Sequence, residues 1–201
     1  AFLGWNPGTE KELYSLDELV RDFDLQKVGH SGARFDPDKA RWFNHQYLQQ
    51  KPVEALAGSF RQVLQTMGVK AGDRQVEQVI ALTRERADFV SDLWEHAGFF
   101  FVPPAGYSEK AVKKRWKEDA AGMMRGLSEL LENIEPFDAE TIEAQVKAAI
   151  ESNEWGMGKV MNAWRLLMVG DLKGPSLFAM AAILGKEEVL RRIERGIAEL
   201  G

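Results

Sequence analysis

Apolar residues recur at helical spacing along most of the chain beyond residue 52, because they lie three or four positions apart and so share one face of a helix. Ala, Leu, Glu, Lys, Arg and Gln dominate these segments, and the alternation typical of strands is absent. The short run Phe99-Phe100-Phe101-Val102 could form a strand but is too short to anchor a sheet. The pattern therefore predicts an all-α helical bundle. The predicted helices span about 53–67, 73–95, 108–132, 139–152, 157–169 and 176–198.

Glycine and proline fall where most of these helices should end, and they punctuate the chain at 68–72, 103–104, 136, 156–158, 170–175 and 185. A seam near 105–120 is expected to divide two helical subdomains.

The first 50 residues carry local helix signals. Ser15 and Glu18 have the spacing of a capping box, which predicts a short helix to about Phe23. Asp36 can cap a second helix whose first position is Pro37. Residues 1–3 resemble the end of an apolar helix, so we expect the chain to be a fragment with further sequence upstream.

Composition and net charge exclude few classes of protein. The chain has 201 residues, 45% of them hydrophobic, no cysteine and a formal net charge of −5. The negative charge argues weakly against nucleic acid, but a local basic patch is enough to bind phosphate. No apolar run approaches the ~18 residues needed to cross a bilayer. We therefore expect a cytoplasmic protein with no membrane partner.

No arrangement of residues indicates catalysis. The histidines His30, His45 and His96 are far apart and have no ligand-like spacing. The segment 156–159 (Gly-Met-Gly-Lys) lacks the strand and spacing of a phosphate loop, and pairs such as Glu187-Glu188 are typical of a solvated helix face. We predict no catalytic residue and no metal site in this chain.

Both ends of the sequence carry a family resemblance. Residues 1–28 (AFLGWNPGTEKELYSLDELVRDFDLQKV), 31–48 (SGARFDPDKARWFNHQYL) and 164–197 (WRLLMVGDLKGPSLFAMAAILGKEEVLRRIERGI) resemble the C-terminal half of bacterial glutamyl-tRNA synthetases. The middle of the chain matches mainly by order and length. The resemblance implies a helical bundle of the class I synthetase anticodon-binding type, preceded by the helical remnant of a stem-contact domain. The implied domains are 1–50, the end of the stem-contact domain, then 51–115 and 116–201, two anticodon-binding helical subdomains.

The resemblance also implies an activity for the full-length enzyme. Such enzymes join glutamate to tRNA(Glu) with ATP and Mg²⁺ during protein biosynthesis, through a Rossmann domain with HIGH-type and KMSKS-type motifs. Neither motif occurs here, so glutamate and ATP would bind only through a catalytic domain outside this sequence. We expect the fragment to hold no cofactor, to bind tRNA(Glu) and to be a monomer.

Arg86 is the first candidate for RNA recognition. In the family, an arginine at the matching place reads the third anticodon base, and the planar fork of arginine can donate two hydrogen bonds to a base edge. Arg84 lies two residues away and is the alternative. Arg86 could equally be an exposed arginine paired with Glu85 or Asp88, which would contribute little.

A second candidate site combines Arg165 with the segment Gly174, Pro175, Ser176 and Leu177. One interpretation is purely structural: the segment is simply the start of a helix. The functional one is that a helix N-terminus offers free N–H groups and a positive dipole end, while glycine and proline let unstacked bases approach the backbone. The resemblance favours the functional interpretation.

Two further basic segments have open interpretations. Lys39 is a candidate phosphate contact toward the tRNA stem, and its neighbour Trp42 is a candidate core residue. The run 110–117 is the most basic segment and is either a solvated amphipathic helix or a non-specific phosphate contact.

Two other functions compete with the RNA-binding fragment. One is a helical protein–protein interaction module without catalytic activity, because helical stacks often serve as scaffolds. The other is an enzyme with an unrecognised site. Salt-dependent binding to folded tRNA would separate the first function from the adaptor.

Overall fold

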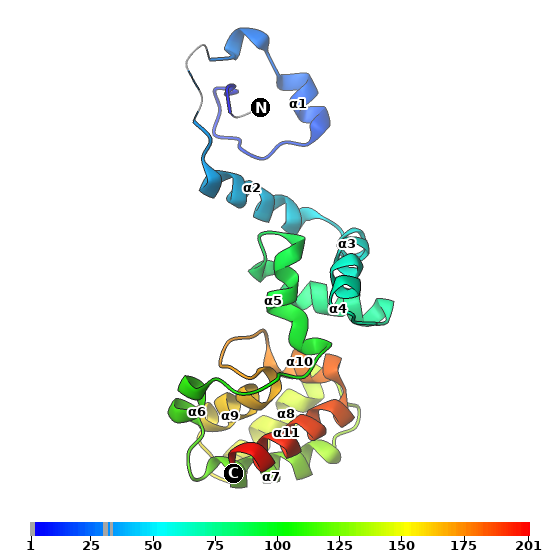
Figure 1. Ribbon diagram of the computed structural model, residues 1–201, viewed down its shortest axis with the longest axis vertical. Coiled ribbons are helices and arrows are strands. Elements are labelled where there is room, and N and C mark those ends of the chain that lie inside the picture. Colours follow the sequence, from blue (N-terminus) through cyan, green and yellow to red (C-terminus); the bar gives the residue numbers. More distant parts are fainter. Residues whose placement is uncertain (1–2, 30–31, 33) are drawn as a thin grey trace. The chain divides into compact units, whose positions relative to one another are not determined.

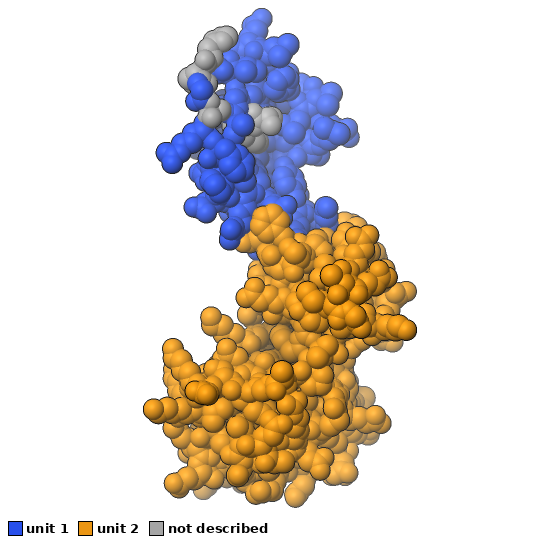
Figure 2. Space-filling view, in the orientation of Figure 1, with its two compact units in different colours: residues 1–51 blue, residues 52–201 orange. Residues whose placement is uncertain are grey.

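The computed structural model describes residues 3–29, 32 and 34–201. The chain forms two compact units, one up to Lys51 and one from Pro52 to Gly201 (Figure 2). The expected end of an apolar helix at residues 1–3 falls largely outside the described residues. The second unit is compact as a whole, and a boundary near 115 between two subdomains stays a prediction.

Local capping signals define the helices of the first unit. Its helices are α1 (Leu16–Asp22), the 3₁₀ helix η1 (Leu25–Lys27) and α2 (Pro37–Gln50). Ser15 Oγ accepts the N–H of Glu18 at 3.2 Å, and the Glu18 carboxylate accepts the N–H of Ser15 at 2.9 Å. Asp36 Oδ1 accepts the N–H groups of Asp38 and Lys39, and Pro37 begins α2. The predicted capping box and the predicted Asp36-Pro37 helix start are both confirmed.

A small aromatic cluster holds the first unit together. Trp5 and Tyr14 are buried, with their ring centroids 6.1 Å apart in an edge-on arrangement. The Tyr47 hydroxyl donates to the Tyr14 carbonyl at 2.9 Å, which ties α2 to the segment before α1. Trp42 is not a core residue, since 38% of it is exposed, and the Lys39 ammonium lies 4.6 Å from its ring centroid.

All the regular secondary structure of the second unit is helical. Its helices are α3 (Val53–Thr66), α4 (Asp73–Thr83), η2 (Arg84–Arg86), η3 (Val90–Asp92), α5 (Leu93–Ala97), η4 (Gly98–Phe100), α6 (Glu109–Arg115), α7 (Ala120–Glu132), α8 (Ala139–Ser152), α9 (Met157–Val169), α10 (Leu177–Leu184) and α11 (Lys186–Leu200) (Figure 1). The only β pairing among the described residues is an isolated bridge between Trp5 and Val28 in the first unit. The all-α prediction is confirmed.

Apolar helix faces meet in the core of the second unit. Helix α9 packs against α7 and α11, and α10 packs against α8, so that Trp164, Leu127 and Ile193 are fully buried. Phe60 and Ile80 are buried on α3 and α4, which pack against each other. Helix α10 also contacts α4 and η4 and thereby joins the two groups of helices.

The predicted single helix over 73–95 is wrong. Helix α4 ends at Thr83, and η2 leads to Ala87, whose backbone is extended although its side chain is fully buried. The Asp92 carboxylate accepts the N–H groups of Asp88 and Phe89, which gives these groups a partner outside a helix. Tertiary burial and this side-chain cap therefore replace helical hydrogen bonds.

Three other sequence predictions also need correction. The predicted helix over 108–132 is interrupted at Trp116, where the backbone is extended, while the Lys117 ammonium donates to the Lys113 carbonyl at the end of α6. The predicted helix over 176–198 divides at Gly185, whose φ of 83° no helix can include. The possible strand at 99–102 is the end of η4 followed by a turn.

Candidate RNA-binding site

The turn between α9 and α10 occupies residues 170–176, and Gly170 determines where it begins. Gly170 has a φ of 77° and donates its N–H to the Leu166 carbonyl at 2.8 Å, which closes α9. A Cβ at this position would lie 2.6 Å from the carbonyl oxygen of Gly106, so only glycine fits. Ser176 caps α10 by accepting the N–H of Ala179, and the side chain of Leu177 is buried behind it.

Two arginines hold the far end of the turn. Arg165, on α9, donates from Nη1 to the Pro175 carbonyl at 2.7 Å. Arg86, at the end of η2, donates from Nη2 to the Gly174 carbonyl at 2.9 Å. A Cβ at Gly174 would lie 2.9 Å from Arg165 Nη1, so glycine lets the guanidinium approach the backbone. Residues 88 positions apart in sequence therefore meet at one short segment.

The charges of these arginines are not neutralised by acids. Among the described residues, no carboxylate forms an ion pair with Arg86 or Arg165. Burial, and then the neighbouring charge of Arg86, lower the pKa of Arg165. An arginine still stays protonated near neutral pH. The carbonyls therefore orient the two guanidinium groups without cancelling their charges.

A cavity of about 390 Å³ opens next to Arg86. It combines cationic groups, two carboxylates and an aromatic ring, and its volume falls in the range of small-ligand sites. It is lined by Arg86, Glu95, His96, Phe99, Val169, Asp171, Lys173 and Gly174.

The structure gathers most of the residues predicted for RNA binding. Arg86, Arg165, Gly174 and Ser176 surround the turn. Pro175 and Leu177 belong to the same segment but are buried, so their exposed neighbours are the parts of the turn within reach of a ligand.

Two predicted residues lie elsewhere. Arg84 begins η2, is half-buried and does not line the cavity. Lys39 belongs to the first unit, where it pairs with Glu12 and lies over the Trp42 ring. The roles of both residues in RNA binding stay predictions.

Sequence reasoning did not find the wall of the cavity opposite the turn. Glu95, His96 and Phe99 come from α5 and η4, a stretch predicted to be the end of a long helix and a possible strand. The cluster of aromatic residues at 99–101 was the one available signal, but it does not say which ring faces a cavity.

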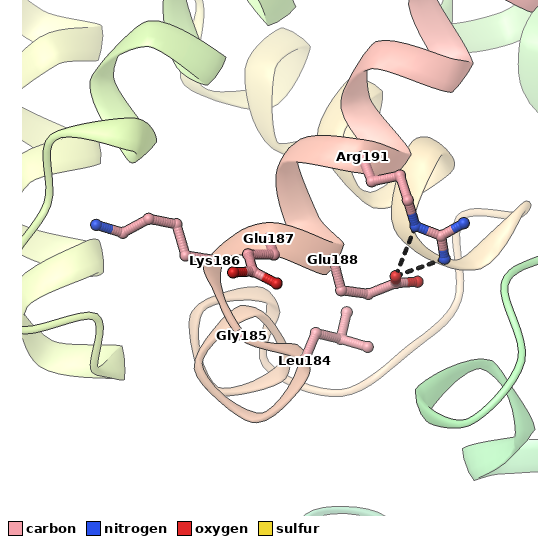
Figure 3. A pocket seen from close by; sticks show the side chains of 6 residues that line it. All are labelled: Leu184, Gly185, Lys186, Glu187, Glu188 and Arg191. Atoms are coloured by element: carbon pink, nitrogen blue, oxygen red, sulfur yellow. Dashed lines mark hydrogen bonds and ion pairs between the residues drawn. The ribbon is translucent and has the colours of Figure 1, made fainter.

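A larger cavity of about 510 Å³ lies at the start of α11 (Figure 3). It is lined by Leu184, Gly185, Lys186, Glu187, Glu188 and Arg191. Figure 3 shows Arg191 reaching the Glu188 carboxylate, to which it donates at 2.9 and 2.5 Å. In this cavity Arg191 is ion-paired with Glu188, whereas Arg86 has no ion pair among the described residues, so the Arg86 cavity is the better candidate for an anionic ligand.

Metal sites and membrane spans are both absent from the described residues. Within residues 3–29, 32 and 34–201, no cluster of acidic and histidine side chains could hold a metal ion. No helix in that same part of the chain has both the length and the apolar character needed to cross a bilayer.

The second unit matches a known domain family. Residues 55–197 match the family described as the anticodon binding domain. This match covers α3 to α11 almost completely and contains both arginines and the turn.

Longer relatives extend the similarity to the whole chain. The chain is 50% identical over 201 residues to the glutamate–tRNA ligase of Porphyromonas gingivalis and 48% identical over 200 residues to that of Flavobacterium johnsoniae. It spans about 40% of the length of each relative.

Solved structures agree with these relatives. A glutamate tRNA ligase from Elizabethkingia meningosepticum, in complex with its amino acid, superposes with a TM-score of 0.94 at 42% identity, over 99% of this chain and 39% of that one. The glutamate–tRNA synthetase of Elizabethkingia anophelis gives a TM-score of 0.90 at 40% identity, over 98% of this chain and 38% of that one. The resemblance inferred from the two ends of the sequence is confirmed.

Proposed function

This chain belongs to the anticodon-binding-domain family, and from that premise we propose that it is the tRNA-binding, C-terminal part of a glutamate–tRNA ligase. The observation that carries the proposal is the convergence of Arg86 and Arg165 on the turn at 174–175, with both charges left without an acid partner among the described residues. Such a site attracts phosphate and offers directed N–H donors to a base.

The full-length enzyme would ligate glutamate to tRNA(Glu) with ATP and Mg²⁺. Glutamate and ATP would bind to a catalytic domain outside this sequence, in a monomeric, cytoplasmic enzyme. The names of the relatives support this function over a helical protein–protein interaction module.

The geometry suggests how one nucleotide is read. One Nη atom of Arg86 donates to the Gly174 carbonyl, which restrains the guanidinium group, and its remaining N–H groups are available for a base edge. The half-buried ring of Phe99 lines the same cavity and offers a surface on which an unstacked base can pack. Lys173, exposed on the turn, is placed to meet a phosphate.

The experiment compares base reading with general affinity in the full-length enzyme. Arg86→Ala is assayed with cognate tRNA(Glu) and with a tRNA changed at the third anticodon base. A base-reading arginine is worth about 1–3 kcal/mol, so discrimination should fall roughly 5- to 150-fold. Arg84→Ala, in the same 3₁₀ helix, tests the alternative residue, and it should leave discrimination intact if Arg86 reads the base.

Each outcome has a distinct meaning. Equal losses for both tRNAs with Arg86→Ala would show that Arg86 does not read the base. A selective loss with Arg84→Ala instead would move the reading residue by two positions. If neither variant changed discrimination, recognition would have to rest on Arg165 and the turn.

A further inference from the structure

Helix α6 presents a row of cations on one face. Lys110, Lys113 and Lys114 are all exposed and follow the spacing of neighbours on one side of a helix. Ala111, which lies off this row, is buried, and α6 packs against α9. The apolar side of α6 therefore rests on the bundle, and its lysine row is directed away from the core.

These lysines have no acidic partners in the part of the chain that the structure describes. Other cations of the second unit are ion-paired: Lys147 with Glu143 at 2.5 Å, and Lys159 with Asp119 at 2.6 Å. On a chain with a net charge of −5, a row of uncompensated lysines is a local departure from the average charge.

Helix α6 is fixed to the same glycine that begins the turn of the candidate site. The N–H of Ser108, the N-cap of α6, donates to the Gly170 carbonyl at 2.8 Å. Arg195 on α11 donates to the Pro104 carbonyl at 2.9 Å and so holds the segment that leads into α6. Gly170 and Gly174 are four residues apart, so the chain between them spans at most about 14 Å. The start of α6 therefore lies close to the turn at which we propose that RNA binds.

We propose that the lysine row of α6 is a second RNA contact, which binds the phosphate backbone of the nucleic acid whose bases the turn reads. This inference rests on the proposed function. It assigns phosphate binding to the lysine row, a surface other than the turn that is proposed to read the base. The row provides affinity that depends on salt and not on sequence, whereas Arg86 and the turn provide selectivity.

The test measures how tRNA affinity depends on salt. The full-length enzyme with Lys110→Gln, Lys113→Gln and Lys114→Gln is titrated with tRNA(Glu) and with a third-base variant over a range of salt concentrations. Each phosphate contact contributes roughly 0.7–0.9 to the slope of log K against log salt, so the slope should become shallower by about 2 to 3. The ratio of the two affinities should stay unchanged.

Matched variants separate local contact from net charge. Replacing Lys147, Lys159 and Arg191 by Gln removes the same amount of positive charge from acid-paired positions and should leave the slope almost unchanged. Replacing the α6 lysines by Arg should preserve the slope, because the charge stays in place. The melting temperature of each variant confirms that the fold is retained.

An unchanged slope in the α6 variant, or an equal change in the matched variant, would overturn the proposal. Failure of the unmodified enzyme to distinguish the two tRNAs is a different result, because it would refute the proposed function itself.

Discussion

Replacing Arg192 by alanine should destabilise the second unit strongly. The Arg192 side chain is only 3% exposed on α11. Its Nη1 donates to the Met168 carbonyl at 2.7 Å, and its Nε donates to Glu188 at 2.6 Å. Met168 lies in the last turn of α9, where carbonyls have no partner within the helix, so Arg192 supplies the missing donor.

The expected cost follows from these contacts. Leaving the Met168 carbonyl buried without a partner costs about 1–3 kcal/mol. The ion pair adds less, because Glu188 is partly exposed and solvent screens its charge. With the packing of the aliphatic stem also lost, the free energy of unfolding should fall by about 2–4 kcal/mol.

Thermal unfolding provides the assay, with Arg191→Ala as the control. Arg191 pairs with the same Glu188 from the adjacent position, but 61% of its side chain is exposed, so its removal should cost less than about 1 kcal/mol. For a unit of this size, the Arg192→Ala loss corresponds to a fall in Tm of roughly 5–15 °C.

Similar small shifts in the two variants would refute the argument. They would mean that water or a rearranged neighbour satisfies the Met168 carbonyl, and that the burial of Arg192 carries little energy.

Two other changes should have defined effects. Gly170→Ala should lower the free energy of unfolding by about 1–3 kcal/mol, because φ is positive and the new Cβ would meet the Gly106 carbonyl; urea unfolding measures it, and a neutral result would contradict the tight fit. Burial alone would raise the pKa of Glu188, but hydrogen bonds from Arg191 and Arg192 outweigh it and lower that pKa. The folded pKa then lies below the unfolded one, so the stabilisation is present above about pH 4.3 and is lost as pH falls through the folded value. The stability difference between the native chain and Glu188→Gln should therefore shrink in acid, and a pH-independent difference would count against this linkage.

Signals that depend on near neighbours were predictable from the sequence. The Ser15 capping box and the Asp36 cap are visible because donor and acceptor lie within three residues of each other. Gly170 was recognisable as punctuation, since only glycine readily adopts its backbone conformation. The helix from 139 to 152 also matched its prediction, because both its cap and its apolar period are local.

Features that depend on tertiary contacts were not predictable. The helical period continues through Ala87, yet the chain is extended there because a buried position and the Asp92 cap are available. Similarly, no pattern in the sequence links Arg86 to Gly174, because the acceptor is a backbone carbonyl that every residue possesses. The family resemblance can thus select candidate arginines, but their hydrogen-bond partners can be identified only once the fold is known.

Four arginines of the second unit, Arg86, Arg165, Arg192 and Arg195, fall into two kinds according to their partners. All of them donate to backbone carbonyls, but Arg192 and Arg195 also pair with Glu188 and Glu199, whereas the described residues provide no ion pair for Arg86 or Arg165. A carbonyl orients a guanidinium group without cancelling its charge, and a carboxylate does both. The fold therefore uses ion-paired arginines to hold the end of α9 and the segment before α6, and the arginines without an ion pair lie at the part of the turn where we propose that RNA binds.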